Sequence, residues 1–318
     1  MLSVKAFGPV PSRRLGRSLG INNIPPKVCT YACAYCQVGR TTKMQVERCA
    51  FYDPEQVVQD VQDKVEKAER AGESVDYLTF VADGEPTMDI NLGHEIELLK
   101  PLGIKIAVIT NASLMWREDV REDLMKANWV SLKVDSTREE VWRRINRPHR
   151  GLELGSIVEG MLEFARAYPG ELVTETMLVE GVNDSADLIE EGANVLAHLR
   201  PSKAYLSIPT RPPTEAWVHA PSEQAIHRAY HILSDKVARV EYLIGAEGNA
   251  FAFTGNVEED LLSITAVHPM REQAVRAFLA RARSDWQVVD RLIAHGQFIE
   301  VEYEGHRFYM RRFDERRG

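Results

Sequence analysis

The alternation of short apolar segments with amphipathic helical segments is the feature that most constrains the fold of this chain. Residues 53–72 are typical of the helices: Asp53 stands at the N-cap, Pro54 at the first helical position and Gly72 after the end. Apolar strands separated by such helices predict a parallel sheet that helices cover. The predicted strands are Ser18–Asn22, Tyr77–Val81, Ile104–Ile109, Trp129–Val134, Leu172–Val179 and Ala204–Ile208, and the predicted helices between them are Asp53–Gly72, His94–Leu99, Glu118–Ala127, 152–167 and Asp187–Leu199.

Polar motifs follow several of the predicted strands directly. They are Asp83-Gly84-Glu85-Pro86-Thr87, Thr110-Asn111, Asp135-Ser136 and Pro209-Thr210-Arg211. Repeated strand–helix units predict an α/β fold, either a partial (βα)6 barrel or an open doubly wound sheet. In both architectures ligands bind at the carboxyl ends of the strands. We therefore expect the functional site at these strand ends.

Three of the four cysteines lie close together, in the sequence CTYACAYC that follows the first predicted strand. Clustered cysteines in a chain without a secretion signal are typical of metal ligands or catalytic groups. Cys29, Cys33 and Cys36 can bind three irons of a [4Fe-4S] cluster and leave the fourth iron open to another ligand. A structural zinc site normally needs four ligands, so zinc would require Cys49 as well. Incidental buried thiols are the other alternative, and we interpret Cys49 itself as a small core residue.

Charge and hydropathy limit the partners that this chain is expected to have. The chain has a net charge of −8, and no apolar run is long enough to span a membrane. Its first residues, MLSVKAFGPVPSRR, lack the apolar region of a signal peptide, so we expect a cytoplasmic protein. An acidic chain is a poor default binder of nucleic acid, because phosphate contacts need Lys and Arg. Residues 261–318 are less acidic, with 10 Lys and Arg against 8 Asp and Glu.

Most of residues 8–255 resembles the radical S-adenosylmethionine (SAM) superfamily, and within it the wyosine-synthase-like iron–sulfur oxidoreductases. The matching segments are GPVPSRRLGRSLGI, CTYACAYCQVGRTT, FVADGEPT, VITNAS, SLKVDS, RINRPH, ETMLVEGVNDS, IPTRPP and AEGNAFAFTG. Tyr35, just before the last cysteine, also fits the pattern. The resemblance implies a partial radical SAM barrel and an enzyme with two cofactors. These are a [4Fe-4S] cluster on the three clustered cysteines and SAM, whose amine and carboxylate bind the open iron.

The resemblance also implies a role for the first strand-end motif. Asp83, Gly84 and Glu85 occupy the position of the family's glycine-rich motif, whose backbone binds the methionyl amine of SAM. A glycine suits that position, because the backbone must approach the ligand closely. Thr110 and Asn111 are then candidates for contacts with the methionyl carboxylate or the ribose.

Residues on the later strands carry further implied roles. Asp135 is a candidate acceptor for the ribose hydroxyls. Lys133 is the candidate catalytic residue: it would pair with a carboxylate of SAM, or it would capture pyruvate as a Schiff base, as is proposed for a lysine of wyosine synthases. Glu175 and Arg211 are additional candidates.

The implied reaction is a one-electron cleavage of SAM. The reduced cluster donates an electron, and the products are methionine and a 5′-deoxyadenosyl radical that abstracts hydrogen from a substrate. An external carrier such as flavodoxin or ferredoxin must supply the electron. Wyosine synthases carry additional N-terminal cysteines for a second cluster, whereas no cysteine precedes Cys29 here. We therefore favour an unidentified small-molecule or protein substrate, and keep tRNA modification as the alternative.

The pattern changes after Gly255 and predicts a second domain. Residues 258–265, 271–283 and 285–295 are predicted helices, and two alternating segments surround the Glu304-Gly305 turn as in a hairpin. This is winged-helix order, so we predict a radical SAM domain over residues 1–256 and a winged-helix-like domain over residues 257–318. We expect the second domain to be separable, and to serve docking or active-site closure.

The winged-helix order also raises a third hypothesis, an iron–sulfur-sensing regulator that binds DNA. Its predicted recognition helix has few side chains that read bases, namely Gln287 and Arg291. The predicted wing carries Glu300, Glu302 and Glu304, which would repel phosphate. The pattern favours a protein-docking module over a DNA reader.

The cysteine spacing predicts one oxygen-sensitive [4Fe-4S] cluster per chain. Anaerobic iron and sulfide analysis should give about four of each per chain, by the stoichiometry of the cluster. Cys49→Ala should leave this content unchanged, because Cys49 lies outside the motif. Two clusters per chain, or stoichiometric zinc, would contradict the prediction.

Overall fold

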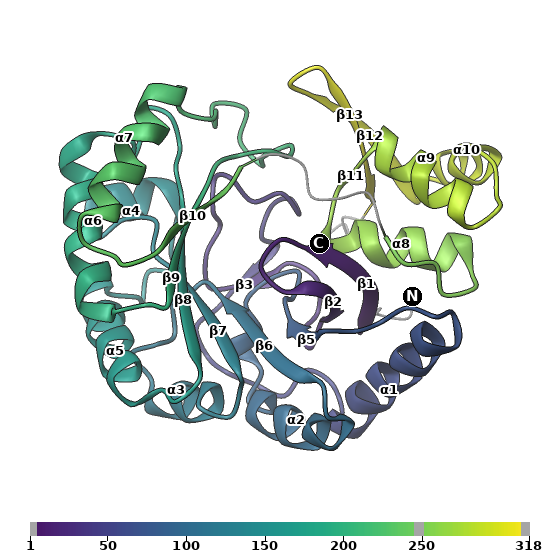
Figure 1. Cartoon of the computed structure of the whole chain (residues 1–318), viewed down its shortest axis with the longest axis horizontal. Coiled ribbons are helices and arrows are strands. Elements are labelled where there is room, and N and C mark those ends of the chain that lie inside the picture. Colours follow the sequence, from purple (N-terminus) through teal and green to yellow (C-terminus); the bar gives the residue numbers. More distant parts are fainter. Residues whose placement is uncertain (1–4, 245–250, 313–318) are drawn as a thin grey trace.

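The curled eight-stranded sheet confirms the predicted α/β partial barrel (Figure 1). The computed structural model describes residues 5–244 and 251–312. The strand order is β1-β2-β5-β6-β7-β8-β9-β10; β1 is antiparallel to β2, and the neighbours from β2 to β10 are parallel. The strands are β1 Ala6–Ser12, β2 Gly16–Ile21, β5 Tyr77–Phe80, β6 Lys105–Thr110, β7 Trp129–Lys133, β8 Glu171–Met177, β9 Lys203–Ser207 and β10 Val240–Leu243. All six predicted strands are present, and β1 and β10 extend the sheet at its two edges.

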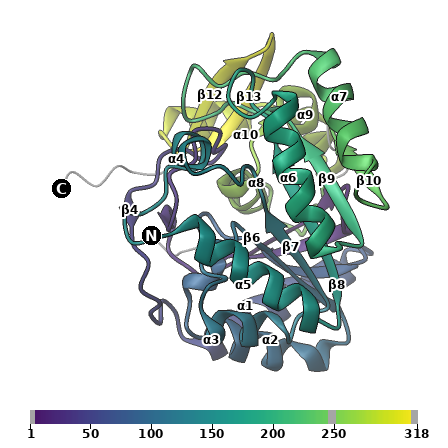
Figure 2. The same ribbon diagram turned by 90° about the vertical axis from the view of Figure 1, so that its left-hand side faces the viewer.

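Helices cover the outer, convex face of the sheet (Figures 1 and 2). They are α1 Pro54–Arg70, α2 Leu92–Leu99, α3 Glu118–Leu124, α5 Leu154–Ala167, α6 Ala186–Leu199 and α7 Glu223–Ser234, with the short 3-10 helix η2 Lys100–Leu102 after α2. Helix α4 Glu139–Ile145 and the 3-10 helix η1 Pro86–Met88 lie instead among the loops at the carboxyl ends of the strands. Helix α1 begins as predicted: the side chain of Asp53 accepts a hydrogen bond from the Glu55 amide at 3.2 Å. No helix in the described part of the chain is long and apolar enough to cross a membrane.

The inner face of the sheet changes from apolar to polar toward the carboxyl ends of the strands. Side chains alternate between the two faces of a strand, so Trp129 and Lys133 of β7 share the inner face. Trp129 packs there against Val173 and Tyr205. Val130 and Leu132 of the same strand belong instead to the core under the helices. The sheet thus has an apolar inner floor, with polar side chains above it.

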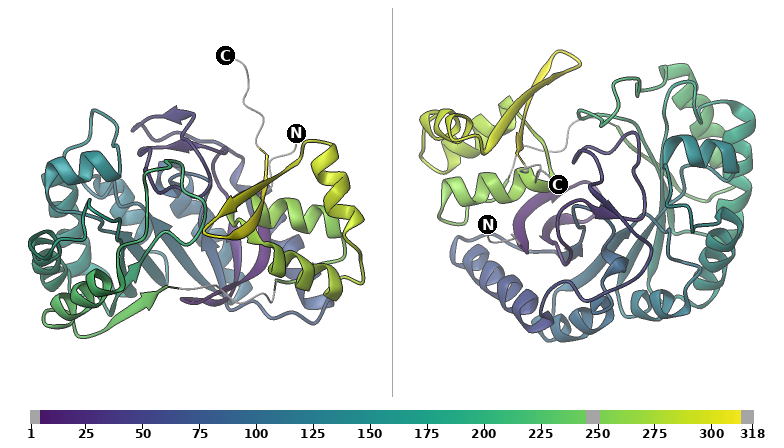
Figure 3. Two further views of the ribbon diagram at one scale, coloured as in Figure 1. Left: turned by 90° about the horizontal axis from the view of Figure 1, so that it is seen from above. Right: turned by 180° about the vertical axis from the view of Figure 1, so that it is seen from behind.

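The C-terminal elements follow the predicted order of helices and hairpin, with one additional short strand. They are α8 Val257–Val267, β11 Met270–Arg271, α9 Glu272–Arg281, α10 Gln287–Ala294, β12 Phe298–Tyr303 and β13 His306–Arg311. Strand β11 overlaps the predicted helix 271–283 only at Arg271, and it pairs with β13 to give a three-stranded sheet (Figure 3). Phe278, Val289 and Leu292 form the centre of a separate apolar core. The boundary near residue 256 and the assignment as a winged-helix-like domain stay predictions.

The C-terminal elements nevertheless contact the sheet and its first helix. Helix α8 lies beside the edge strand β1, whose Val10 packs against the C-terminal core (Figure 1). Lys64 of α1 and Asp260 of α8 form an ion pair at 2.7 Å, with side chains only 7% and 2% exposed. Arg281 of α9 pairs with Glu73 after α1. These contacts argue against easy separation, and a chain ending near Asn256 would leave Lys64 buried without its carboxylate.

We expect Asp260→Asn to lower the free energy of unfolding by about 3–5 kcal/mol, because removal of one partner leaves a buried charge uncompensated. Urea denaturation followed by circular dichroism measures this change. The control is Glu258→Gln, which breaks an exposed ion pair with Arg291 and should cost about 0–1 kcal/mol. Equal effects of the two substitutions would mean that the buried pair does not hold α8 to the barrel.

Candidate functional site

The cysteine loop lies at the carboxyl end of β2 and is held there by backbone hydrogen bonds. Its start, β3 Val28–Cys29, pairs with β4 Lys43–Met44. The amide of Ala34 donates to the carbonyl of Ile145 at 2.9 Å, and that of Ala32 donates to the Asn146 carbonyl at 3.1 Å. The segment after α4 therefore fixes the middle of the loop.

The three clustered cysteines are free thiols, and two of them contact side-chain amides. The Nδ2 atom of Asn111 lies 3.6 Å from the sulfur of Cys29, and that of Asn146 lies 3.6 Å from the sulfur of Cys33. Burial raises the pKa of both thiols, that of Cys33 to about 12. Amide donors suit thiolates that bind a positive group, because hydrogen bonds to sulfur stabilise its negative charge.

The described residues form no site for a single metal ion. Among the residues that the structure describes, no three or more His, Cys, Asp or Glu side chains are placed to hold one metal ion. A [4Fe-4S] cluster makes a different demand, because each cysteine binds its own iron. The donor set of the loop, three cysteines and two nearby amides, has the chemistry that such a cluster needs.

Glu85 joins the ends of β5 and β6. Its carboxylate is fully buried and accepts hydrogen bonds from the hydroxyls of Thr87 and Thr110, both at 2.6 Å, and from the amide of Asn111 at 2.7 Å. The amide of Thr87 donates as well, at 3.1 Å. Protein groups thus occupy the side chain of Thr110, which was predicted to contact SAM, and the side chain of Glu85, whose backbone was predicted to do so. Asn111 turns toward Cys29 and also donates to the hydroxyl of Thr30 at 2.9 Å.

Gly84 and Asp83 lie directly against the cysteine loop. A Cβ atom on Gly84 would stand 1.8 Å from the carbonyl oxygen of Val28, so this glycine is required by the loop and not only by a ligand. Asp83 is buried, and its Oδ2 atom accepts from Asn22 at 3.3 Å. Burial raises the pKa of Asp83 to about 7, although Lys27 and Arg311 oppose that shift. Its Oδ1 atom has no hydrogen-bond partner in residues 5–244 and 251–312.

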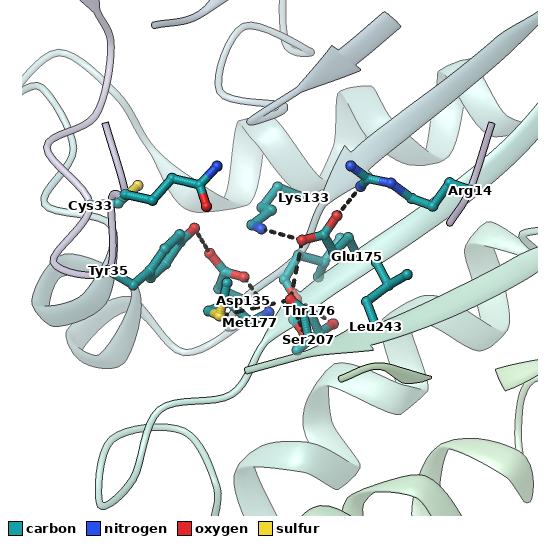
Figure 4. Close-up of polar contacts among 12 residues, drawn as sticks. Arg14, Cys33, Tyr35, Lys133, Asp135, Glu175, Thr176, Met177, Ser207 and Leu243 are labelled. Carbon is teal, nitrogen blue, oxygen red and sulfur yellow. Dashed lines mark hydrogen bonds and ion pairs between the residues drawn. The ribbon is translucent and has the colours of Figure 1, made fainter. Parts of the chain in front are cut away.

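Asp135 is held by protein groups where a ribose contact was predicted. Its Oδ2 atom accepts from the hydroxyl of Tyr35 (Figure 4). The same oxygen accepts from the side-chain amide of Asn146 at 2.7 Å. Its Oδ1 atom accepts from the amide of Met177 at 2.8 Å. Asp135 therefore connects the end of β7 to β8 and to Tyr35 of the cysteine loop, and burial raises the pKa of its carboxyl.

Lys133, Glu175 and Arg14 form a buried ionic group at the strand ends (Figure 4). Parallel pairing sets Lys133 of β7 beside Glu175 of β8, and the Lys133 ammonium lies 2.8 Å from the Glu175 carboxylate. Arg14, from the turn between β1 and β2, pairs with the other carboxylate oxygen. Burial favours the neutral form of each group, but Lys133 and Arg14 lower the pKa of Glu175 to about 2, and Glu175 and Asp135 raise the pKa of Lys133. The ion pair with Glu175 thus favours the protonated form of Lys133.

A cavity of about 270 Å³ opens between this ionic group and the cysteine loop. Its lining includes Cys36, Lys133, Glu175 and Arg211, all of which the sequence singled out. Arg211 donates to the side chain of Gln37 at 2.7 Å and lies 3.0 Å from the imidazole of His268, so it connects the cysteine loop to the C-terminal elements. The remaining lining residues are Arg13, Arg14, Tyr35, Gln37, Val38, Met177, Ser207, Ile208, Pro209, Thr210 and Leu243.

Several side chains of this site were not singled out from the sequence. Arg14 was quoted only within a matching segment, and Ser207, whose hydroxyl donates to Glu175 at 3.1 Å, lies within a predicted strand, before the Pro209-Thr210-Arg211 motif. Asn146 lies after an unpredicted helix. Cys49, in contrast, pairs through its backbone with Asp89, and its sulfur accepts from Gln45 at 3.6 Å.

Comparison with known proteins identifies close relatives and a shared fold. Residues 23–191 match the Radical SAM superfamily. A UPF0026 protein of Methanocaldococcus jannaschii is 47% identical over 98% of this chain and 97% of its own length, and one of Synechocystis sp. is 35% identical over 65% of this chain and 76% of its own.

Two solved structures share the fold at low sequence identity. A radical SAM methyltransferase from Sphaerobacter thermophilus superposes with a TM-score of 0.53 at 18% identity, covering 72% of this chain and 67% of its own. TYW1 with a lysine-pyruvate adduct bound gives 0.51 at 17% identity, covering 70% and 74%. These likenesses concern the fold alone.

We expect Gly84→Ala to displace the cysteine loop, because the new methyl group would overlap the Val28 carbonyl. The iron content after anaerobic reconstitution should fall, and the free energy of unfolding should fall by about 1–3 kcal/mol, as for other overpacked interiors. The matched control is Gly155→Ala in α5, where a Cβ atom meets nothing within 4 Å. Full iron content with lost SAM binding would show that Gly84 serves the ligand alone.

Proposed function

Because this chain belongs to the radical SAM superfamily, whose enzymes use a [4Fe-4S] cluster and SAM, we propose that Cys29, Cys33 and Cys36 bind the cluster and that SAM occupies the adjoining cavity. The observation that carries the proposal is the position of the cysteine loop. The loop lies at the carboxyl ends of a parallel half-barrel, and Cys36 itself lines the cavity. Ligands of such sheets bind at this end.

The two cofactors supply the bond cleavage, an electron from the cluster and a 5′-deoxyadenosyl radical from SAM. The chain positions and encloses them. Asn111 and Asn146 donate to the cysteine sulfurs. The buried Oδ1 atom of Asp83, beside the loop, has no hydrogen-bond partner among residues 5–244 and 251–312. The apolar floor under Lys133 and Glu175 limits the entry of water from below. We propose that the product radical abstracts hydrogen from a small-molecule or protein substrate.

Lys133 is best suited to act as a fixed positive charge. A protonated amine has no free electron pair with which to attack a carbonyl, and the Glu175 carboxylate, 2.8 Å from the Lys133 ammonium, favours the protonated form. This disfavours the Schiff base that the resemblance to wyosine synthases suggested. We propose that Lys133 instead attracts a carboxylate, either of SAM or of the substrate, into the cavity.

The alternatives differ in what supports them. Modification of tRNA is supported by the resemblance to wyosine synthases and by the less acidic C-terminal part. The DNA-binding regulator has weaker support, because Arg291 of the predicted recognition helix pairs with Glu258 at 2.5 Å. Measuring 5′-deoxyadenosine with cell tRNA and with a tRNA-free extract separates tRNA modification from action on a small molecule or a protein.

The test of the proposed function is the production of 5′-deoxyadenosine. Anaerobically reconstituted enzyme with SAM and a strong reductant should release 5′-deoxyadenosine and methionine, measured by liquid chromatography. The triple variant with Cys29, Cys33 and Cys36 changed to Ala should release neither. Strong stimulation by cell tRNA, and none by a tRNA-free extract, would favour the tRNA alternative.

We expect Lys133→Gln to weaken SAM binding or cleavage about 10- to 100-fold, the usual range for a lost hydrogen bond to a charged group. Calorimetry separates binding from the cleavage rate. Lys203→Gln is the matched control, because Lys203 pairs with Glu241 at the opposite ends of its strands and should have no effect. Unchanged binding and cleavage in Lys133→Gln would exclude the proposed role.

A further inference from the structure

A group of exposed arginines surrounds the outer side of the cysteine loop. We call it the basic rim and define it as Arg40, Arg143, Arg144, Arg147, Arg150 and the ring of Trp217. The backbone that carries it also holds the cysteines: the carbonyl of Arg147 accepts from Ala32 at 3.1 Å, and the amide of His149 donates to Thr30 at 2.9 Å. The segment that carries Arg147 and Arg150 is therefore bonded directly to the proposed cluster loop.

The charge of the basic rim is opposite to that of the chain as a whole. The chain carries a net charge of −8, whereas the rim gathers five arginines. Glu139 pairs with Arg143 at 2.6 Å, and Glu215 pairs with Arg147 at 2.7 Å and more loosely with Arg40 at 3.9 Å. With Glu140, which is exposed on the same helix as Arg143 and Arg144, three carboxylates lie among the five guanidiniums, so the rim keeps a positive balance. The Arg40 side chain is 80% exposed, so much of this charge faces solvent.

Trp217 gives the basic rim an ordered apolar centre. The guanidiniums of Arg144 and Arg147 lie 5.6 and 5.9 Å from the centre of its ring, and the ring remains 37% exposed. Cation–π contacts hold both arginines in place. Less side-chain entropy is then lost when a partner binds, which favours docking at this surface.

We propose that the basic rim is the docking surface for an acidic one-electron carrier protein of the flavodoxin or ferredoxin type. The inference rests on the proposed function, because a cluster in this loop must receive an electron from outside. One electron passes from the carrier, which is oxidised, to the cluster, which is reduced, and no atoms are exchanged. A compact acidic protein would contact only the rim and avoid the acidic remainder of the chain.

Nucleic acid fits the same surface less well. A long polyanion would extend from the rim over a chain of negative net charge, which repels it. The guanidiniums of Arg144 and Arg147 also lie near the exposed ring of Trp217, where they compete with bases for stacking on its face.

The experiment compares reduction by a protein with reduction by a small molecule. The double variant Arg40→Glu/Arg150→Glu reverses two exposed charges of the rim. The control variant, Arg166→Glu/Arg239→Glu, makes the same charge change at exposed arginines of α5 and of the segment before β10. Cluster reduction is followed by anaerobic stopped-flow absorbance, with reduced recombinant flavodoxin or with photoreduced 5-deazariboflavin, which is small and uncharged.

The rim variant should be reduced by flavodoxin at least about tenfold more slowly at low salt, and its rate should depend less on ionic strength. Its rate with deazariboflavin should be unchanged, and the control variant should match the parent chain in both. Equal flavodoxin rates in the rim variant and the parent would overturn the inference. Slower reduction of the rim variant by both reductants would also overturn it, because the rim would then support the cluster and not the carrier.

Two further outcomes separate this inference from its alternatives. Loss of tRNA binding at physiological salt in the rim variant, with flavodoxin rates intact, would assign the surface to nucleic acid. A parent chain that assembles no iron–sulfur cluster would refute the proposed function and this inference with it. Iron analysis of the parent chain detects a missing cluster before any carrier protein is added.

Discussion

The site depends on a single buried carboxylate, that of Glu85. A fully buried carboxylate is unfavourable unless donors surround it, and here four hydrogen bonds converge on it. They fasten η1 to the end of β6, and so place Asn111 within reach of the Cys29 sulfur. Gly84, next to Glu85, lets the Val28 carbonyl approach from the other side. The cysteine loop is thus positioned by polar contacts that join the ends of β5 and β6.

The central strands could be predicted because each is an apolar run between helices with clear ends. The edge strands could not. Strand β1 contains Pro9 and Pro11, which argue against a strand, although an edge strand tolerates them. Strand β10 has only four residues, and β11 has two and directly precedes a helix, so neither carries enough periodicity to be recognised. Edges are decided by tertiary pairing, which local sequence does not report.

The site was predictable where its residues follow strands in one motif, and less so where distant segments meet. Lys133 and Glu175 were both candidates, but their ion pair depends on the register of β7 and β8. Arg14 reaches Glu175 from a turn far away in the sequence, and nothing around it signals that contact. Asp135 looks like a ligand-binding residue in sequence, yet Tyr35, Asn146 and Met177 use its carboxylate. The polar residue types in a sequence indicate where a site lies. They do not indicate which of those side chains are already hydrogen-bonded to other protein groups.

The contact of α8 with β1 links the C-terminal elements mechanically to the cavity. Strand β1 leads directly into the turn that carries Arg13 and Arg14, and both arginines line the cavity. Close-packed interiors are stiff and transmit displacement. A partner that displaces α8 is therefore expected to shift strand β1 as well. That shift would move Arg14, and with it the ion pair between Arg14 and Glu175 at the wall of the cavity.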